Sequence, residues 1–332
     1  MPDRSAAWRF CVAPMMQYTD RHFRFLARRL SRHTRLYTEM VVASALLRGD
    51  GARLLAHDPA EVPVALQLGG SNPAELAAAA RIGAAAGFCE VNLNVGCPSD
   101  RVQSGRFGAC LIAEPALVAD CVAAMHAAVG VPVTVKTRLG VDEFDNDEHL
   151  ARLVDGVRQA GCRTLIVHAR KALLNFSPRA NREIPPLQYP RVYALKRAFP
   201  ELRIIINGGI ASLLEAGRHL EEVDGVMLGR AAYAQLDILR HVDRVLFGET
   251  APPVDDMALL DSLEAYAARE SVNGTGLHHL TRHLLGLRQG APGAREWRRL
   301  IGSHNQRAGL DASSAFAEAR ALLRAVRRMD AA

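Results

Sequence analysis

Along the first 248 residues, one unit of hydrophobic and polar patterning recurs: a short apolar run, a turn and an amphipathic stretch. The apolar runs indicate eight strands, at 10–14, 36–39, 63–68, 89–93, 132–137, 164–168, 203–207 and 225–228. Alanine- and leucine-rich stretches with helical periodicity separate most of them, at 73–86, 115–128, 149–160 and 213–220. Because strands alternate with helices, the pattern predicts an α/β fold with a parallel sheet.

Eight such units favour closure into a (β/α)8 (TIM) barrel over an open, doubly wound sheet, because such a barrel takes about 250 residues. An open sheet would normally carry a nucleotide fingerprint after its first strand, and neither GxGxxG nor GxxxxGK[ST] occurs in the sequence. We therefore expect the barrel to occupy residues 1–248.

The pattern changes after the barrel. Thr250-Ala-Pro-Pro-Val indicates a linker, because its two prolines stop a helix. Beyond the linker, helical periodicity recurs at 256–270, 276–287, 294–302 and 313–328. The sequence thus predicts a small all-helical C-terminal domain over residues 249–332.

Composition narrows the class of protein. No run of about 18 apolar residues is free of charges and prolines, and the N-terminal residues lack the apolar core of a signal peptide. We expect a cytoplasmic protein without a membrane segment. The six cysteines include no CxxC pair, which argues against the usual zinc sites and against a disulfide framework, so no metal is expected.

The net charge of +6 is carried by arginine, since lysine occurs only at 136, 171 and 196. Residues 21–35 hold six arginines and no acid, and residues 282–307 hold six arginines and one acid. Such runs usually mark a solvated face, but two of them in one basic protein also suit a polyanionic partner.

Polar residues gather at the predicted C-terminal ends of the strands, where a (β/α)8 barrel carries its active site. They are Gln67, Asn92, Asn94, Lys136, Arg138, His168, Asn207, Gly208, Gly209, Gly229 and Arg230. Their convergence on one rim predicts a binding or catalytic site. The glycines allow a close backbone approach and precede predicted helices, so together with Arg230 they predict a phosphate site after strands 7 and 8.

Two residues of this rim have reactive side chains. A lysine within a barrel strand is costly without an anionic partner, so Lys136 predicts a ligand charge. Its role is either that of a Schiff-base nucleophile or that of a cation beside an electron-rich ring. Cys97, in the loop after the fourth strand, is a candidate nucleophile or general acid. Cys110 is interpreted as mainly structural.

Taken together, these motifs resemble those of the tRNA-dihydrouridine synthases. The resemblance spans the whole barrel and rests on Ala13-Pro-Met-Met, Gln67, Asn92-Leu-Asn-Val-Gly-Cys-Pro, Val135-Lys-Thr-Arg, His168-Ala-Arg, Asn207-Gly-Gly-Ile and Gly229-Arg230. The stretch 171–189 is similar to the DusA subfamily, which modifies positions 20 and 20a of the D-loop. Gln17-Tyr18 and Asn175-Phe176 depart from the pairs Asp-Trp and Gly-Leu that are more usual there.

The resemblance implies that residues 1–248 form an FMN-binding catalytic barrel and residues 249–332 a tRNA-binding domain. FMN would be held by Pro14, Met15, Met16, Gln67, Lys136, His168, Asn207, Gly208, Gly209, Gly229 and Arg230. NADPH would reduce the flavin, hydride would pass to C6 of a D-loop uridine, and Cys97 would protonate C5. The implied tRNA contacts are Asn94, Arg179, Asn181, Arg182, Arg298 and Arg299.

Two alternatives stay open from the sequence. The first is another FMN barrel, which reduces a small enone or oxidises a dihydropyrimidine and has no need of a basic helical tail. The second is a basic tRNA-binding protein without catalytic activity. For a protein that must bind a large RNA, a monomer is expected.

Overall fold

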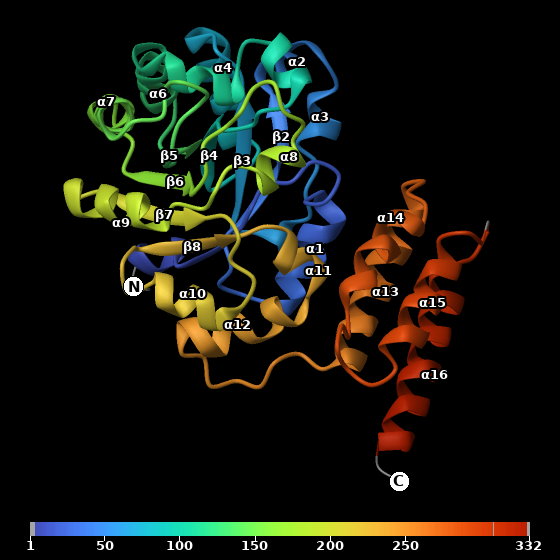
Figure 1. Cartoon of the computed structure of the whole chain (residues 1–332). Helices are drawn as coiled ribbons and strands as arrows, with labels where there is room; N and C mark the ends of the chain where they lie inside the picture. The colour runs from blue at the N-terminus through green and yellow to red at the C-terminus, as the bar shows by residue number, and fades with distance from the viewer. Residues whose placement is uncertain (1–3, 308, 331–332) are drawn as a thin grey trace.

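The computed structural model describes residues 4–307 and 309–330, and it shows a barrel of parallel strands with a helical bundle at its side (Figure 1). The outermost residues of the two expected domains, 1–3 and 331–332, lie outside the described residues. The strands are β1 (Phe10–Val12), β2 (Leu36–Val42), β3 (Val64–Gly69), β4 (Glu90–Val95), β5 (Val133–Arg138), β6 (Thr164–His168), β7 (Arg203–Asn207) and β8 (Gly225–Leu228).

The eight strands form one sheet in the order β1-β8-β7-β6-β5-β4-β3-β2, with every neighbouring pair parallel. Backbone hydrogen bonds join the two outer strands of this order: Val12 N donates to Arg35 O and Arg35 N donates to Phe10 O, each over 2.9 Å. These bonds close the ring, so the predicted (β/α)8 barrel is confirmed.

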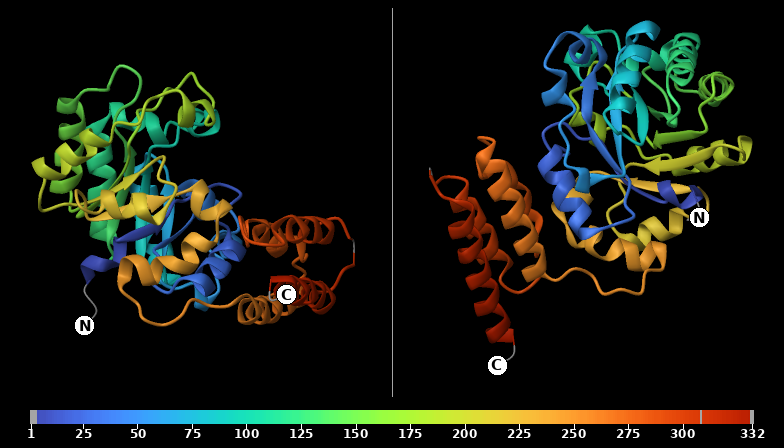
Figure 2. Two further views of the ribbon diagram at one scale, coloured as in Figure 1. Left: turned by 60° about the horizontal axis from the view of Figure 1, so that its bottom comes forward. Right: turned by 180° about the vertical axis from the view of Figure 1, so that it is seen from behind.

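Helices wrap the outside of the barrel (Figures 1 and 2). They are α1 (Arg21–Leu30), α2 (Ala43–Arg48), α3 (Gly51–Leu54), α4 (Pro73–Ala85), α5 (Asp100–Ser104), α6 (Pro115–Ala128), α7 (Asp147–Gln159), α8 (Ala180–Glu183), α9 (Tyr189–Ala198), α10 (Leu213–His219), α11 (Arg230–Ala234) and α12 (Asp237–Phe247), with 3-10 turns η1 (Arg4–Trp8), η2 (Pro59–Glu61) and η3 (Gly108–Ala113). Several begin at a capping side chain that accepts a backbone N–H of the first turn, as Asn72 does for α4 and Asn146 for α7.

The barrel interior has an apolar side and a polar side. The apolar side is a buried cluster separate from the layer between strands and helices, and it comprises Trp8, Cys11, Ala13, Tyr37, Ala65, Ile166, Ile205 and Met227. The polar side comes from β3, β4 and β5, whose buried side chains include Gln67, Asn92, Asn94 and Thr134. Because side chains alternate along a strand, these residues share the inward face, and their polar column ends at the loop that carries Cys97.

A buried carboxylate closes the end of the barrel at which the strands begin. Glu90 is fully buried and accepts hydrogen bonds from Trp8 Nε1 (2.8 Å), Arg35 Nη2 (2.6 Å) and Tyr37 OH (2.9 Å). The guanidinium groups of Arg35 and Arg203 each lie 4.6 Å from the centroid of the Trp8 ring. A charge without water must be paired and hydrogen-bonded, so this end of the barrel has a structural role.

The C-terminal helices form a bundle beside the barrel (Figure 2). They are α13 (Asp256–Val272), α14 (His278–Thr281), α15 (Ala294–His304) and α16 (Ala312–Asp330), with the 3-10 turn η4 (Arg282–Gly286). The ring of Tyr266 stacks on Phe25 of α1 with 3.9 Å between centroids, and its hydroxyl lies 2.8 Å from His22 Nδ1. Ion pairs from Arg21 to Glu270 and from Arg282 to Asp20 add to this contact between α1 and the tail.

Two elements differ from the prediction. The segment 276–287 is not one helix, because α14 tightens into η4, which brings Gly286 against the barrel. A Cβ there would lie 2.7 Å from the carbonyl oxygens of Tyr233 and Ala234. Strand β2 runs on to Val42 rather than ending at Glu39, because it resumes pairing with β3 after a bulge.

Candidate functional site

The sheet register brings the predicted rim residues onto neighbouring strands at one end of the barrel. Gln67 pairs with Asn92, and Asn94 pairs with Lys136 on the next strand. Arg138 pairs with His168, which in turn pairs with Asn207. The polar residues that the sequence assigns to strands 3 to 7 therefore form a continuous arc at the C-terminal ends of the strands.

The loop after β4 holds Cys97 from two sides. Asn94 Oδ1 accepts the backbone N–H groups of Gly96 (3.1 Å) and Cys97 (3.0 Å). Arg138 Nε donates to the carbonyl of Gly96 over 3.0 Å, and Ala109 N donates to that of Cys97 over 2.9 Å. Cys97 is partly buried and packs against the edge of the hydrophobic core, and its Sγ lies 3.5 Å from Ser99 Oγ.

The thiol of Cys110 has different surroundings. Its Sγ donates to the carbonyl of Phe107 over 3.1 Å, and burial raises its pKa. A thiol with a raised pKa that is engaged by backbone of the same turn is a poor nucleophile. The geometry agrees with its interpretation as a structural residue.

Lys136 carries a charge that the protein does not compensate. Burial, and next the positive charge of Arg138, lower the pKa of Lys136 to about 8. Burial also lowers the pKa of Arg138, to about 10. In the described residues, the ammonium of Lys136 has neither a hydrogen-bond partner nor an ion pair. A lysine held in this way needs an anionic or electron-rich ligand to offset its desolvation.

His168 lies among the same cations. Burial, followed by the charges of Arg138 and Lys136, lowers its pKa well below the ordinary value for histidine, so the imidazole is neutral at physiological pH. Its buried Nδ1 has no partner among the described residues, and neither does the buried Nε of Arg182. Such unpaired buried groups are rare in native structures and mark a place where a ligand can bind.

The cationic rim extends to Arg170 and Arg182, both with pKa values lowered mainly by burial. Within residues 4–307 and 309–330, none of Lys136, Arg138, Arg170 and Arg182 forms an ion pair. Arg138 instead donates to the carbonyls of Lys171 and Asn181, and Arg170 to that of Pro185. The rim is therefore a site for an anion.

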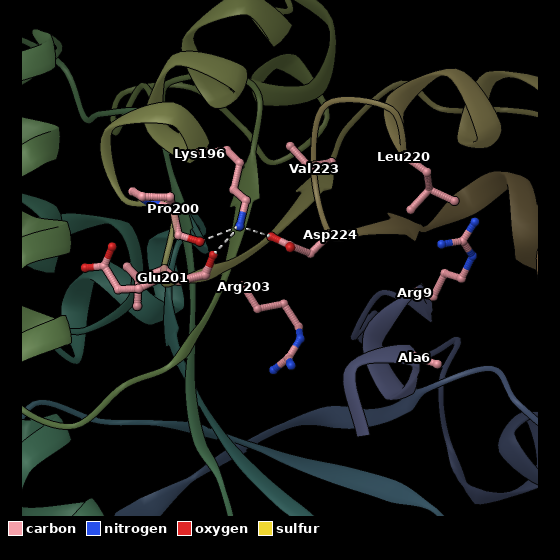
Figure 3. A pocket seen from close by; sticks show the side chains of 10 residues that line it. Ala6, Arg9, Lys196, Pro200, Glu201, Arg203, Leu220, Val223 and Asp224 are labelled. Atoms are coloured by element: carbon pink, nitrogen blue, oxygen red, sulfur yellow. Dashed lines mark hydrogen bonds and ion pairs between the residues drawn. The ribbon is translucent and has the colours of Figure 1, made fainter. Parts of the chain in front are cut away.

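Lys196 shows how the protein treats a structural lysine. It lines a hollow of about 410 Å³ at the end of the barrel where β7 and β8 begin (Figure 3). Its ammonium donates to the carbonyls of Pro200 and Leu202, each over 2.9 Å, and pairs with Asp224 at 2.8 Å. The contrast with the uncompensated Lys136 separates the two ends of the barrel into a supporting face and a ligand-binding face.

Glycine is required at two positions after β7. Gly208 and Gly209 have φ values of +114° and +76°, in the region that favours glycine. A Cβ on Gly208 would lie 3.2 Å from His168 Nε2, and one on Gly209 would lie 2.7 Å from the hydroxyl of Tyr189. That hydroxyl donates to the carbonyl of Gly208 over 2.8 Å. Both glycines are therefore required by their φ values and by the close packing of His168 and Tyr189 against them.

The loop after β1 completes the rim. Pro14 and Met15 are partly buried, whereas Met16 has 55% of its side chain exposed. Met15 Sδ lies 3.4 Å from the position of a Cβ on Gly229, so this loop lies against the end of β8. Arg230 follows at the start of α11 with an exposed side chain. All the residues implied as flavin contacts thus lie at the ligand-binding face.

The implied tRNA contacts divide by exposure. Arg179, Arg298 and Arg299 are exposed. Asn94 and Asn181 are buried, and the amide of Asn181 donates to the carbonyls of Leu173 and Phe176 within the loop after β6. In this structure these two asparagines shape the loops of the site, so contact with RNA by either of them stays a prediction.

The two basic runs also divide by exposure. In 21–35, three of the six arginines are buried and engaged, namely Arg24, Arg28 and Arg35. In 282–307, Arg282, Arg288 and Arg307 pair with acids. Arg295, Arg298 and Arg299 are exposed on α15 at spacings of three and four, so they share one face of the helix. That face is a positive surface of the tail, and Arg324, Arg327 and Arg328 of α16 are exposed as well.

Comparison with known proteins agrees with this geometry. The family model described as dihydrouridine synthase (Dus) matches residues 11–325. The chain belongs to this family. Membership of the dihydrouridine synthase family makes it an oxidoreductase, and the match covers both the barrel and the helical tail.

Curated relatives in the dihydrouridine synthase family are similar over nearly the whole chain. The tRNA-dihydrouridine(20/20a) synthase of Escherichia coli (strain K12) is 54% identical over 316 residues, covering 94% of this chain and 91% of that protein. The enzyme of the same name from Pseudomonas putida is 56% identical over 294 residues, covering 88% of each. That from Shewanella oneidensis is 53% identical over 305 residues, covering 91% of each.

A solved structure adds support for the fold alone. A complex of 2-naphthoyl-CoA reductase with 2-naphthoyl-CoA is similar with a TM-score of 0.53 and 11% sequence identity, covering 73% of this chain and 50% of that chain. In the described part of the chain, no helix is long and apolar enough to cross a membrane. Among the same residues, no group of three or more His, Cys, Asp and Glu side chains is placed to hold a metal ion.

Sequence reasoning missed two contributors to the site of this dihydrouridine synthase. Thr134 lies two residues before Lys136 on β5, and its hydroxyl joins the polar column of the barrel interior. The period of two along a strand places both on one face and could have identified it. From the sequence, Arg170 is named only within the motif His168-Ala-Arg. No pattern in the sequence shows that its charge lacks an acidic partner among the described residues.

Proposed function

We propose that the chain reduces the C5=C6 bond of D-loop uridines 20 and 20a in tRNA to 5,6-dihydrouridine, with FMN at the rim and NADPH as electron donor. The observation that carries the proposal is the uncompensated positive charge of Lys136 and Arg138 beside the thiol of Cys97. The substrate is inferred from relatives more than half identical over about nine-tenths of the chain, which are named for this reaction.

The residues at the rim fit FMN, which has both a phosphate and an electron-rich ring. The unpaired Nδ1 of His168 and the free ammonium of Lys136 are features that such a ligand would satisfy. The group would be held by Pro14, Met15, Met16, Gln67, Lys136, His168, Asn207, Gly208, Gly209, Gly229 and Arg230. Once reduced by NADPH, FMN supplies the hydride that is added to C6 of the uracil ring.

Lys136 and His168 then have distinct tasks. An anionic ligand favours the charged form of a lysine, so binding raises the pKa of Lys136 and keeps its ammonium protonated beside the negative charge. His168 is neutral, because burial and the neighbouring cations lower its pKa, and it can offer one N–H and one acceptor nitrogen. Together they bind and orient the ring without a metal ligand set.

Cys97 donates the proton to C5. Cys97 lies close enough to Lys136 and Arg138 to interact electrostatically with both. The bonds of Asn94 and Arg138 to the loop keep the sulfur in place while the uracil ring enters. A positioned general acid of this kind accelerates a reaction by about 100-fold or more.

The helical tail binds the tRNA body in this proposal, with residues 1–248 as the catalytic domain and residues 249–332 as the tRNA-binding domain. A uridine inside a folded tRNA must be drawn out of its stack before its ring can reach Cys97. The exposed face of Arg295, Arg298 and Arg299 has no acidic partner within the described residues, which suits contacts with phosphates.

The direct test uses the purified protein with FMN, NADPH and an unmodified tRNA transcript. We expect dihydrouridine at positions 20 and 20a, measured by mass spectrometry of nuclease fragments. Free uridine and small enones serve as competing substrates. Rapid turnover of a small enone without any dihydrouridine in the tRNA would show that the chain is a different kind of flavin barrel.

A further inference from the structure

A column of side-chain hydrogen bonds runs up the barrel interior from Glu90 toward the Cys97 loop. Thr134 Oγ1 donates to Glu90 Oε1 over 2.5 Å, and Asn92 Nδ2 donates to Thr134 Oγ1 over 2.8 Å. Gln67 Nε2 donates to Asn92 Oδ1 over 2.8 Å, which carries the column from β4 across to β3. Every member so far is at most 1% exposed, so water does not compete for these bonds.

Two more links reach the loop. Asn94 Nδ2 donates to Gln67 Oε1 over 2.9 Å, and Asn94 Oδ1 accepts the backbone N–H of Cys97 over 3.0 Å. The column therefore joins the charged end of the barrel to the backbone of Cys97 without a gap.

The direction of this column is fixed at both ends. Glu90 accepts from an indole, a guanidinium and a phenol as well as from Thr134, the pattern of a carboxylate that has no hydrogen to donate. Because the one hydrogen of the Thr134 hydroxyl goes to Glu90, that oxygen can only accept from Asn92. The backbone N–H of Cys97 can only donate, which requires the oxygen of Asn94 to face it. Both ends thus impose the same orientation on the three amides between them.

We propose that Thr134 is a positioning residue that anchors the lower end of this column and thereby holds Cys97 in place for proton transfer; the proposal rests on the function proposed above for that thiol. Thr134 links the charged carboxylate of Glu90, to which its hydroxyl donates, with the neutral amide of Asn92, from which the same oxygen accepts. When the Thr134 hydroxyl is present, Gln67 is held with its side-chain oxygen toward Asn94, and its second N–H is left for the ligand. Without it, Asn92 loses its acceptor, and the three amides are held only from the Cys97 end, so the column is less rigid.

The test compares three variants of the FMN-loaded protein. Thr134→Val removes the hydroxyl with little change of volume, and Thr134→Ser restores a hydroxyl at the same position. Thr164→Val is the matched control, because Thr164 is also buried in a barrel strand and loses one side-chain hydrogen bond, from Arg203, outside the column. The readouts are hydrogen exchange of the Gly96 and Cys97 amides, the alkylation rate of Cys97 by iodoacetamide, and the rate of dihydrouridine formation.

We expect Thr134→Val to raise amide exchange in the Cys97 loop about tenfold, to change the alkylation rate, and to slow dihydrouridine formation about tenfold. Thr134→Ser should restore all three, and Thr164→Val should leave them as in the wild type. Unchanged exchange and alkylation in Thr134→Val would overturn the proposal, as would the same change in both valine variants. If the wild-type protein forms no dihydrouridine, the proposed function is wrong. Hydrogen exchange and alkylation still test whether Thr134 positions the Cys97 loop, because neither depends on that activity.

Discussion

Replacing Lys136 by methionine should stabilise the flavin-free protein while weakening its hold on FMN. Lys136 is partly buried beside Arg138 without a compensating acid among the described residues, so its ammonium is held at a cost in the folded state. Methionine is similar in length and fills the same space without a charge. The change therefore removes a desolvation penalty that only a bound anion offsets.

The size of this desolvation penalty follows from the difference in the pKa of Lys136 between the folded and the unfolded chain. Burial lowers the pKa of Lys136 from 10.5 to about 8, and a difference of one in pKa corresponds to about 1.4 kcal/mol. The penalty is thus about 3 kcal/mol at pH 7. Because the folded state has the lower pKa, the penalty is fully present below about pH 8 and is relieved as the pH rises toward 10.5.

Urea denaturation of flavin-free wild type and Lys136→Met measures this penalty. The variant should be more stable by about 3 kcal/mol at pH 7, and the difference should fall below about 1 kcal/mol at pH 10. Lys196→Met is the control, since that ammonium is satisfied by Asp224 and two carbonyls and its loss should destabilise the protein. A Lys136→Met protein no more stable than the wild type at pH 7 would refute the reasoning.

Adding FMN should stabilise the wild type more than Lys136→Met and so reverse the order of their stabilities. The wild type gains the attraction between the ammonium and the ligand, whereas the variant cannot, so the unfolding midpoint should rise more in the wild type. Titration with FMN, followed by quenching of flavin fluorescence, gives the affinity directly. Equal affinities would remove Lys136 from the flavin site.

Three further predictions follow from the structure. Cys97→Ala should keep FMN and NADPH oxidation but lose about 100-fold in dihydrouridine formation, measured in single turnovers. Glu90→Gln should cost about 3–5 kcal/mol in unfolding free energy by urea titration, because it leaves the buried guanidinium of Arg35 without its anionic partner. Arg298→Glu combined with Arg299→Glu should weaken tRNA binding about tenfold and flatten its salt dependence, whereas Arg152→Glu on the barrel should not. Binding that is unaffected by the paired reversal would place the RNA elsewhere.

The barrel could be predicted from the sequence because its signals are local. Each strand is a short apolar run, and each predicted strand overlaps an observed one, from β1 at Phe10 to β8 at Leu228. The polar residues at strand ends could be placed on one rim because parallel strands share an end. The extension of β2 could not, because Thr38 and Glu39 interrupt the apolar pattern and only pairing with β3 carries the strand across the bulge.

The rest of the site depends on contacts between distant residues. Arg24 and Arg28 belong to a basic run in the sequence, but the fold places them against Glu61 and backbone carbonyls, so their charge is not offered to a partner. The same holds for Arg282, which pairs with Asp20 across 262 positions of the chain. The sequence shows how many charged residues there are, but only the three-dimensional structure shows which of them form ion pairs and which are available to a partner.

The segment 276–287 shows the same limit for secondary structure. Its apolar spacing predicts one helix, and the observed change to a 3-10 turn comes from the approach of Gly286 to the barrel backbone at Tyr233 and Ala234. That contact joins residues about fifty positions apart. No property of the segment itself distinguishes the tighter turn from a regular helix.

The central claim is that this chain makes dihydrouridine in the tRNA D-loop with Cys97 as the acid. The most direct measurement maps dihydrouridine in tRNA from cells that lack the gene, complemented with either the wild type or Cys97→Ala. Without the gene, positions 20 and 20a should lose dihydrouridine; the wild type should restore it, and Cys97→Ala should leave both positions unmodified. Dihydrouridine that persists at both positions without the gene, or full restoration by Cys97→Ala, would contradict the claim.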